Sequence, residues 1–580
     1  MKKLIFYLGL SLILSSCARV GSPVGGAKDS LAPRFMGSNI DTTRINVPTS
    51  LKSLQLDFDE YITLKDVQRN LTISPPIKIK RILPSMLGNK YVLIEWEEPL
   101  LENTTYNLNF GNAIADLNEG NVLSYFNFAF STGDYLDETY ISGEVTDGML
   151  RTREEDELQP IRKSDYVVGL YQEKDSMDYR TKPYYITKAD PDGYYELNYL
   201  TPGKYRLLAF EDENQNSVFD AGEEKVAFLK DSIDLQKSIS GLPITLYPSK
   251  KPIRYKETKE STGGFSVYFE GQPKSVSVQL DDRIKDYKVT YKPYSDSLHV
   301  WFDARKQDIG ITQSENIKFS YQADEKTGEA SLFYRLNPQN ELTLSNAKGN
   351  MISPNSPFEI VSNYPIDTVN TQNWTLKVDS VTTLEFKAII DQIDPKKLKI
   401  DANFESGKKY SLALPKESVS SYYISNEKAY QFNFEVDKEE NYGTLVLQLQ
   451  GAPESKFWIQ FLDQNEVVKF QRLTEGTEHR FTEIPPATYQ LRILVDQNGN
   501  GVWDAADFAN FEFAEPVFVF PKLIEIRGLW ENRENWDLET GSTETPNIVA
   551  SPLLDPSVEK ATTDSVEVTI DSLEQIVKPL

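Results

Sequence analysis

Two loops of similar sequence hold the residues with the clearest potential for chemistry. The loop nearer the C-terminus contains Asp496, Asn498, Asn500, Val502, Asp504 and Asp507. The other loop contains Asp212, Asn214, Asn216, Val218, Asp220 and Glu223. In each set, side-chain oxygens fall at the first, third, fifth, ninth and twelfth positions, and a valine supplies a backbone carbonyl at the seventh. Because this is the ligand spacing of an EF-hand loop, it predicts a calcium ion in each loop.

A metal-free turn would use the same residue types. Asp and Asn side chains accept hydrogen bonds from their own backbone in Asx turns. The first loop has Ser217 where calcium loops have glycine for a sharp turn, and the second has Asp507 where they have a longer glutamate. No helical pattern flanks either loop, so neither is an EF-hand domain. Both interpretations give the loops a structural role, and both stay open at this point.

Cys17 is the only cysteine of the chain, so no intramolecular disulfide can form. It follows two lysines, an apolar run over residues 4–14 and two serines, which is the layout of a signal peptide. The run is too short for a permanent membrane-spanning helix. Residues 14–17 (LSSC) resemble the lipobox of bacterial lipoproteins. The resemblance implies cleavage before Cys17 and palmitate-type acylation, and Ala18 in place of aspartate implies the outer membrane.

The residues needed for catalysis are sparse. The two histidines, His299 and His479, are far apart in the sequence, and Cys17 offers no thiol once it is acylated. The sequence contains no nucleophile elbow, zinc-protease motif or phosphate-binding loop. A glycosidase acting through two carboxylates needs a cleft that small repeated domains do not suggest. We therefore expect no enzyme, although aromatic residues such as Tyr422, Tyr423 and Trp530 could stack on sugars or pack in a core.

One short pattern is overrepresented: aspartate, then serine or threonine, then an apolar residue or threonine. It recurs more often than average composition predicts. The aspartates that open it are Asp29, Asp41, Asp175, Asp231, Asp296, Asp367, Asp379, Asp564 and Asp571. The pattern resembles the O-glycosylation acceptor of periplasmic proteins of the Bacteroidota. The alternative is a set of ordinary strand entries.

Strand patterns dominate the rest of the chain. Residues 54–58, 91–96 and 106–110 alternate apolar and polar side chains, and no stretch carries a helical period over three turns. We expect an all-β fold of tandem β-sandwiches in an elongated array. The expected parts are a signal peptide (1–16), a lipidated tether (17–30), an Ig-like domain (31–134), a transthyretin-like sandwich (135–248), a β-sandwich (249–338), an Ig-like sandwich (339–440), a second transthyretin-like sandwich (441–536) and a disordered tail (537–580).

Several segments resemble known domain families. Residues 58–62 (FDEYI), 71–76 (LTISPP) and 130–133 (FSTG) resemble SbsA-type bacterial Ig-like domains. Residues 200–208 (LTPGKYRLL) resemble transthyretin-like or carboxypeptidase-regulatory-like sandwiches. Residues 484–493 align without a gap with residues 200–209, which indicates an internal repeat. Together they resemble multidomain Ig-like lipoproteins of the Bacteroidota.

The net charge of the chain limits the classes of molecule that it can bind. The formal net charge of −25 repels nucleic acids and anionic headgroups. We expect a non-enzymatic, outer-membrane-anchored lipoprotein that binds other outer-membrane proteins as a scaffold subunit of a β-barrel assembly, secretion or uptake machine. The alternative is a cell-surface adhesin or glycan-binding protein. We expect no required cofactor, and the two loops are candidate calcium sites. We favour display at the cell surface over the periplasmic face.

Overall fold

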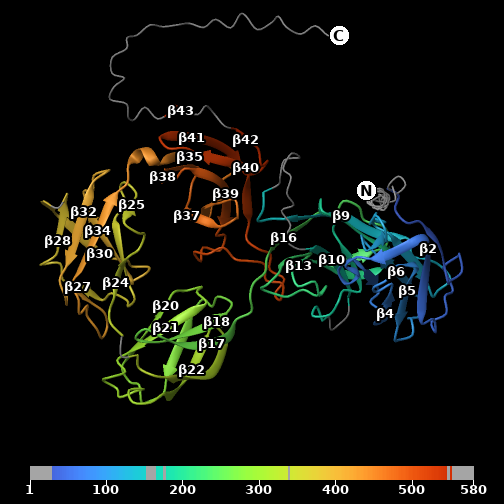
Figure 1. The fold of residues 1–580 in the computed structure, drawn as a ribbon, viewed down its shortest axis with the longest axis horizontal. Coiled ribbons are helices and arrows are strands. Elements are labelled where there is room, and N and C mark those ends of the chain that lie inside the picture. Colours follow the sequence, from blue (N-terminus) through green and yellow to red (C-terminus); the bar gives the residue numbers. More distant parts are fainter. Residues whose placement is uncertain are drawn as a thin grey trace, which may run out of the picture. The chain divides into compact units, whose positions relative to one another are not determined.

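The computed structural model describes residues 29–151, 165–173, 178–337, 340–379, 381–544 and 549–550. These residues form an almost purely β structure, which confirms the predicted all-β class (Figure 1). Among them, helix is confined to α2 (Val67–Asn70) and the 3-10 turn η1 (Glu439–Asn441). No helix of the described part is long and apolar enough to cross a membrane. Cys17, the signal peptide and most of the tail lie outside the described residues.

The first sandwich follows from alternation along its strands. In β2, Leu54, Leu56 and Phe58 are buried while the residues between them are partly exposed, so one face of the strand enters the core. One sheet has the order β1-β2-β5-β4 with β7 beside β2, and the other has the order β3-β6-β8. The strands are β1 (Phe35–Ser38), β2 (Ser53–Leu64), β3 (Thr72–Ser74), β4 (Ile79–Leu83), β5 (Asn89–Trp96), β6 (Thr105–Asn109), β7 (Ile114–Asp116) and β8 (Asn127–Ser131).

The second block is one continuous sheet that folds over its own core. Its order is β11-β10-β13-β14-β16-β9-β12, with β15 beside β13. Strands from both ends of this order share one apolar cluster that includes Ile141, Leu170, Leu197 and Leu207. The strands are β9 (Thr139–Asp147), β10 (Asp165–Gln172), β11 (Tyr185–Lys188), β12 (Tyr194–Leu200), β13 (Gly203–Asp212), β14 (Lys225–Phe228), β15 (Ile233–Leu235) and β16 (Ile244–Pro248).

The third block packs the sheet β17-β18-β21-β20 with the sheet β19-β22-β23. Its strands are β17 (Arg254–Ser261), β18 (Gly264–Glu270), β19 (Val276–Leu280), β20 (Tyr287–Tyr291), β21 (Ser297–Phe302), β22 (Glu315–Ala323) and β23 (Lys326–Tyr334).

The fourth block packs the sheet β24-β26-β31-β30 with the sheet β25-β34-β32-β28-β29, and β27 pairs with β33 beside them. Its strands are β24 (Leu344–Asn346), β25 (Met351–Ile352), β26 (Phe358–Ser362), β27 (Thr368–Val369), β28 (Thr375–Val378), β29 (Thr382–Leu384), β30 (Phe386–Ile390), β31 (Lys397–Ala402), β32 (Lys409–Leu414), β33 (Val419–Ser420) and β34 (Tyr430–Val436).

The fifth block repeats the topology of the second. Its sheets have the orders β37-β36-β39-β40 and β38-β35-β41-β42, with β43 beside β41. The parallel pair β35·β41 and the antiparallel pair β35·β38 correspond to β9·β16 and β9·β12. The two copies therefore share one fold, as the repeated sequence predicts. The strands are β35 (Gly443–Gln450), β36 (Phe457–Leu462), β37 (Val468–Thr474), β38 (Glu478–Ile484), β39 (Ala487–Val495), β40 (Val517–Ile526), β41 (Trp530–Asp537), β42 (Thr543–Glu544) and β43 (Val549–Ala550).

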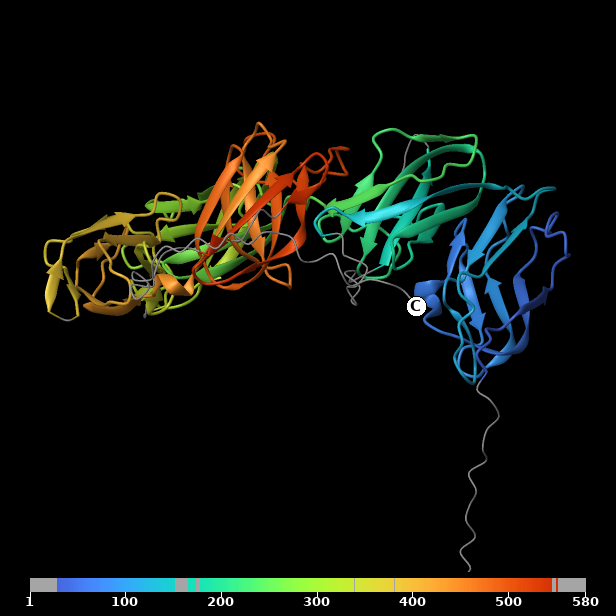
Figure 2. The same cartoon turned by 90° about the horizontal axis from the view of Figure 1, so that it is seen from above.

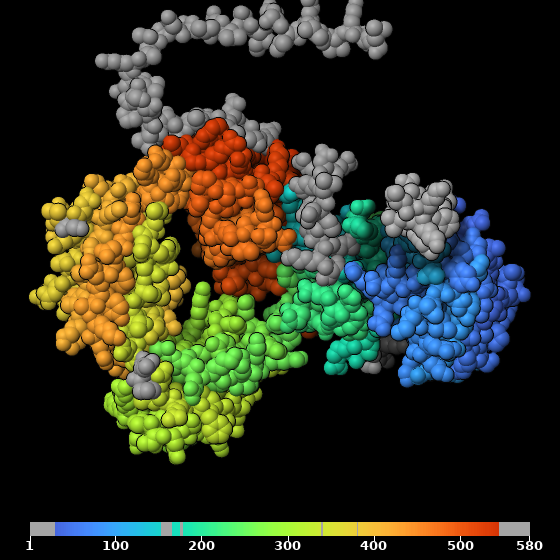
Figure 3. Space-filling view, viewed as in Figure 1, coloured from blue at the N-terminus to red at the C-terminus, as the bar shows by residue number. Residues whose placement is uncertain are grey.

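The blocks group into two compact units. Of the described residues, the first unit holds the first two sandwiches up to Leu246, and the second holds those from Tyr247 onward, together with residues 148–151 and 221–223. Figure 2 shows the sheets of the first sandwich, in blue, from above. In the space-filling view each block is a filled body with its own range of sequence colours (Figure 3).

Candidate functional site

The repeated loops occupy the same place in the two equivalent sandwiches. Asp212 ends β13, and Asp496 directly follows β39. In the C-terminal copy, Asp496 accepts hydrogen bonds from the backbone N–H of Asn500 at 2.9 Å and of Gly501 at 2.9 Å. The side-chain amides of Asn498 and Asn500 donate to Asp504 Oδ2 at 2.6 and 2.7 Å. The first four side-chain oxygen positions thus converge around one turn.

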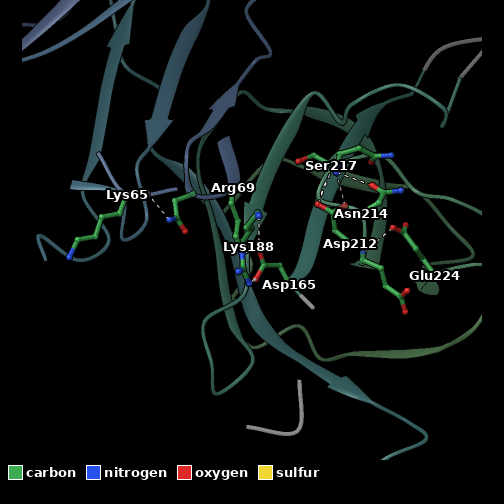
Figure 4. A network of polar contacts seen from close by, with 11 residues as sticks. Lys65, Arg69, Asp165, Lys188, Asp212, Asn214, Ser217 and Glu224 are labelled. Carbon is green, nitrogen blue, oxygen red and sulfur yellow. Dashed lines mark hydrogen bonds and ion pairs between the residues drawn. The ribbon is translucent and has the colours of Figure 1, made fainter. Parts of the chain in front are cut away.

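The first copy has the same pattern of bonds (Figure 4). Asp212 accepts from the backbone N–H of Asn216 at 3.0 Å and of Ser217 at 3.1 Å. Asn214 and Asn216 donate to Asp220 Oδ2 at 2.6 and 3.1 Å. The seventh residues, Val218 and Val502, each donate their N–H to the asparagine side chain two positions earlier.

The residues at the twelfth position lie elsewhere. Glu223 pairs with Lys251 and Asp507 pairs with Lys250 at 3.3 Å. Their place is taken by two other acids, Glu224 and Glu515.

Glu515 Oε1 accepts from Asn498 N–H at 3.0 Å, and its Oε2 accepts from Asp504 N–H at 2.9 Å. Glu224 binds the backbone of Glu213 and Asp220 in the corresponding way, at 3.1 and 3.0 Å. Each glutamate therefore clamps both ends of its loop.

Burial shapes the electrostatics of the first loop. It raises the pKa of Glu224 to about 7, and the nearby carboxylates of Asp212 and Asp220 add to this effect. Burial also raises the pKa of Asp212. Clustered carboxylates in a partly dry site favour a proton or a cation.

The loops can hold a metal only through mixed oxygen ligands. Within the described residues, no group of three or more His, Cys, Asp or Glu side chains is placed to bind a metal ion. Each loop does gather carboxylate and amide oxygens, which are hard ligands that calcium accepts. These oxygens already accept backbone hydrogen bonds but keep further lone pairs. Calcium binding by the two loops stays a prediction.

The structure places the other candidate residues as follows. Cys17, the patterns beginning at Asp175, Asp564 and Asp571, and Ser380 of the pattern beginning at Asp379 lie outside the described residues. Of the remaining acceptor hydroxyl residues that are described, Ser30, Thr42 and Thr368 are exposed, whereas Ser232 and Ser297 are partly buried. Glycosylation of these residues stays a prediction.

Neither histidine is arranged as a general base. His299 stacks on Trp301 with ring centroids 3.6 Å apart, and its Nδ1 lies 3.0 Å from the hydroxyl of Ser266. Burial, with Lys396 as a second cause, lowers the pKa of His299 to about 3, so the ring is neutral at pH 7. His479 is buried against Phe457.

An ion cluster ties the first two sandwiches together inside the first unit (Figure 4). Arg69 from α2 donates to Asp165 at 2.8 and 2.7 Å, and Lys188 donates to the same carboxylate at 2.7 Å. Beside it, Ser74 Oγ accepts from Ile186 N–H at 3.0 Å. Sequence patterns did not predict these contacts because each partner lies in a separate strand or helix.

Comparison with known proteins identifies the first sandwich. Residues 29–132 match the model of the bacterial Ig-like domain (Big_5), which confirms the prediction made for this block. The chain is thus a multidomain protein that combines a bacterial Ig-like domain with further β-sandwiches. No curated protein sequence matches it.

Solved structures resemble the chain only distantly. Surface layer protein SbsC, domains 1–6, is 9% identical over 86% of this chain and 68% of its own, with a TM-score of 0.14. BcpA, the major pilin subunit of Bacillus cereus, is 10% identical over 69% of this chain and 99% of its own, with a TM-score of 0.12. The Bacteroides ovatus protein SGBP-B, solved with a mixed-linkage heptasaccharide, is 8% identical over 67% and 94%, with a TM-score of 0.19. At such TM-scores these likenesses carry no argument about function.

Proposed function

We propose that this chain is a non-enzymatic lipoprotein, anchored in the outer membrane through Cys17 and displayed at the cell surface. Its role is to bind other outer-membrane proteins as a scaffold subunit. The observation that carries the proposal is the packing between consecutive sandwiches within each unit. A scaffold needs fixed spacing between its binding surfaces, and domains joined only by flexible linkers do not provide that spacing.

Side chains cross the junctions in both units. In the first unit, the Asp165 ion cluster joins the first two sandwiches. In the second unit, Trp301 of the third sandwich belongs to the apolar cluster of the fourth, with its ring 5.3 Å from that of Tyr364. The fifth sandwich contacts the segment 248–250 that leads into the third sandwich, where Ala506 exchanges backbone hydrogen bonds with Pro248 and Lys250 at 3.0 and 2.8 Å. These contacts support a scaffold role.

The first sandwich carries an apolar loop tip suited to partner contact. The turn between β4 and β5 exposes Met86 by 94% and Leu87 by 85%, and the neighbouring Leu117 is 45% exposed. Exposed apolar side chains grouped at a loop tip favour an interaction surface, and one or two such anchors dominate many interfaces.

Affinity purification of full-length variants from native membranes tests the scaffold proposal. The double substitution Met86→Lys/Leu87→Lys should reduce co-purification of outer-membrane proteins without changing the protein's own abundance. Val381→Lys, at an 81% exposed residue of the second unit, is the matched control and should leave co-purification unchanged. Failure of the wild-type protein to retain any outer-membrane protein would contradict the proposal.

Glycan binding is the second candidate function. The observation that favours it is a polar groove between the third and fourth sandwiches, lined by hydroxyl, lysine and aspartate side chains.

A further inference from the structure

A groove of about 820 Å³ lies between the third and fourth sandwiches, inside the second unit. One wall consists of β20, β21 and their connection, and includes Tyr291, Lys292 and Ser297. The other wall is the segment 391–397 that connects β30 to β31. The volume falls in the range of small-ligand sites. The walls are held together by Trp301, which packs across the junction onto Tyr364, so the groove is a built feature of the fold.

The acids of the groove are already neutralised by lysines. Asp391 pairs with Lys399 at 2.6 Å. Asp394 pairs with Lys397 at 3.7 Å. The remaining cations of the lining are Lys292 and Lys396. Although the chain as a whole is strongly acidic, this groove carries a local excess of positive charge.

The ammonium group of Lys396 is partly buried and lies close to an aromatic ring. Its Nζ lies 5.0 Å from the centre of the Trp301 ring, which is stacked on His299. Within the part of the chain that the structure describes, Lys396 Nζ forms no hydrogen bond or ion pair. Burial lowers the pKa of Lys396, and Asp394 offsets this only in part. A cation–π contact alone offsets only part of the desolvation cost of a partly buried ammonium group. A bound anion would therefore stabilise the charged form of Lys396.

The rest of the lining is rich in hydroxyl groups. They belong to Ser266, Thr290, Tyr291, Ser295 and Ser297. Several of them donate to neighbouring protein oxygens, as Tyr291 does to Ser295, yet each keeps lone pairs that can accept hydrogen bonds. Such acceptors suit the hydroxyl donors of a sugar. A peptide ligand would instead require paired backbone donors or apolar side-chain pockets.

We propose that this groove binds a saccharide bearing a carboxylate or sulfate group, and that the anionic group pairs with Lys396. The inference deepens the glycan-binding candidate by naming a site and a ligand class. It does not depend on the scaffold role, because loss of protein co-purification and loss of saccharide binding are separate measurements.

The full-length protein offers a site-specific readout, because it contains only two histidines. Titration with trigalacturonate, followed by NMR of the histidine ring C–H signals, should shift the signal of His299 in the groove. The signal of His479 in the fifth sandwich is the internal control and should stay in place. The methyl ester of trigalacturonate should shift neither, and a sulfated disaccharide distinguishes sulfate from carboxylate as the preferred anion.

Substitution of the lysine tests the pairing. Lys396→Met should weaken trigalacturonate binding by at least about tenfold in calorimetry, because the anion loses its partly buried partner. Lys428→Met removes an exposed lysine of the same sandwich that pairs with Glu341, and it should bind like the wild type.

Three results would overturn the proposal. They are unchanged affinity in Lys396→Met, equal binding of the methyl ester, and a His299 shift produced by triglutamate but not by trigalacturonate. If Lys396→Met does not fold, the wild-type histidine shifts decide the question on their own.

Discussion

Replacing Asp165 with asparagine removes the carboxylate that joins the first two sandwiches. Asp165 binds Arg69 and Lys188 at once. The Lys188 side chain is only 16% exposed, against 43% for Arg69. The substitution therefore leaves a partly buried ammonium without its carboxylate partner, which is the costly way to break an ion pair.

The size of the effect follows from the pKa of Asp165. Burial raises this pKa, but the hydrogen bonds and charges of Arg69 and Lys188 outweigh burial and lower it from 3.8 to about 2. A difference of nearly two units corresponds to about 2 kcal/mol. Because the folded-state pKa is depressed, this stability is fully present above the unfolded value of about 4 and is lost as the pH falls from about 4 towards about 2.

The free energy of unfolding of the first unit is the quantity to measure. Trp96 lies in the first unit, and the other tryptophans of the chain lie in the second. Fluorine NMR of 5-fluorotryptophan-labelled protein in increasing denaturant therefore follows each unit separately. At pH 7, Asp165→Asn should lower the stability reported by Trp96 by about 2 kcal/mol and leave the other signals unchanged. Between pH 4 and pH 2 the variant should lose about 2 kcal/mol less stability than the wild type, because the contribution of Asp165 is absent.

The matched control is Asp178→Asn. Asp178 pairs with Arg180 on the surface, with side chains 52% and 89% exposed, and because solvent screens such a pair its removal should destabilise the first unit far less than Asp165→Asn does. If Asp165→Asn destabilised the first unit no more than this control does, the cluster would not hold the two sandwiches together and the reasoning would be refuted.

Three further predictions concern the loops and the anchor. Ser217 has φ = 60° and Gly501 has φ = 90°, so Ser217→Gly should stabilise its sandwich by a few tenths of a kcal/mol and Gly501→Ser should destabilise its sandwich by about 1 kcal/mol, as measured by thermal unfolding. Calcium should raise the unfolding temperature of the fifth sandwich more than that of the second, because only Gly501 adopts the turn without strain. If the unfolding temperatures were identical in calcium and in chelator, the loops would be metal-free turns. Cys17→Ser should abolish metabolic labelling by a palmitate analogue, and normal labelling of the variant would exclude the proposed anchor.

Local sequence patterns predicted the fold class because the alternation of apolar and polar side chains along a strand involves only neighbouring residues. The buried series Leu54, Leu56 and Phe58 is visible in the sequence and again in β2. The repeat around residues 200–208 and 484–493 likewise predicted two sandwiches of one topology. Alternation also predicts which side chains enter a core, since the period is set by the backbone.

Contacts between residues that are distant in the sequence could not be predicted from such local patterns. Sequence spacing predicted Glu223 as the acid that faces the first loop. In the structure Glu223 pairs with Lys251, and the adjacent Glu224 binds the loop instead. Glu515 follows an insertion absent from the first copy, so alignment of the repeats could not find it. The pairing of Lys396 with Trp301 depends on how two sandwiches meet, and no local signal marks it.

Site-specific photocrosslinking in living cells tests the central claim, direct binding to outer-membrane proteins, most directly. A photoreactive phenylalanine analogue at Met86, in the apolar loop tip of the first sandwich, should give a discrete crosslink to an outer-membrane protein. The same analogue at Val381 is the control and should not give that crosslink. Absence of any protein crosslink from position 86, in a protein that is folded and anchored, would contradict the scaffold account.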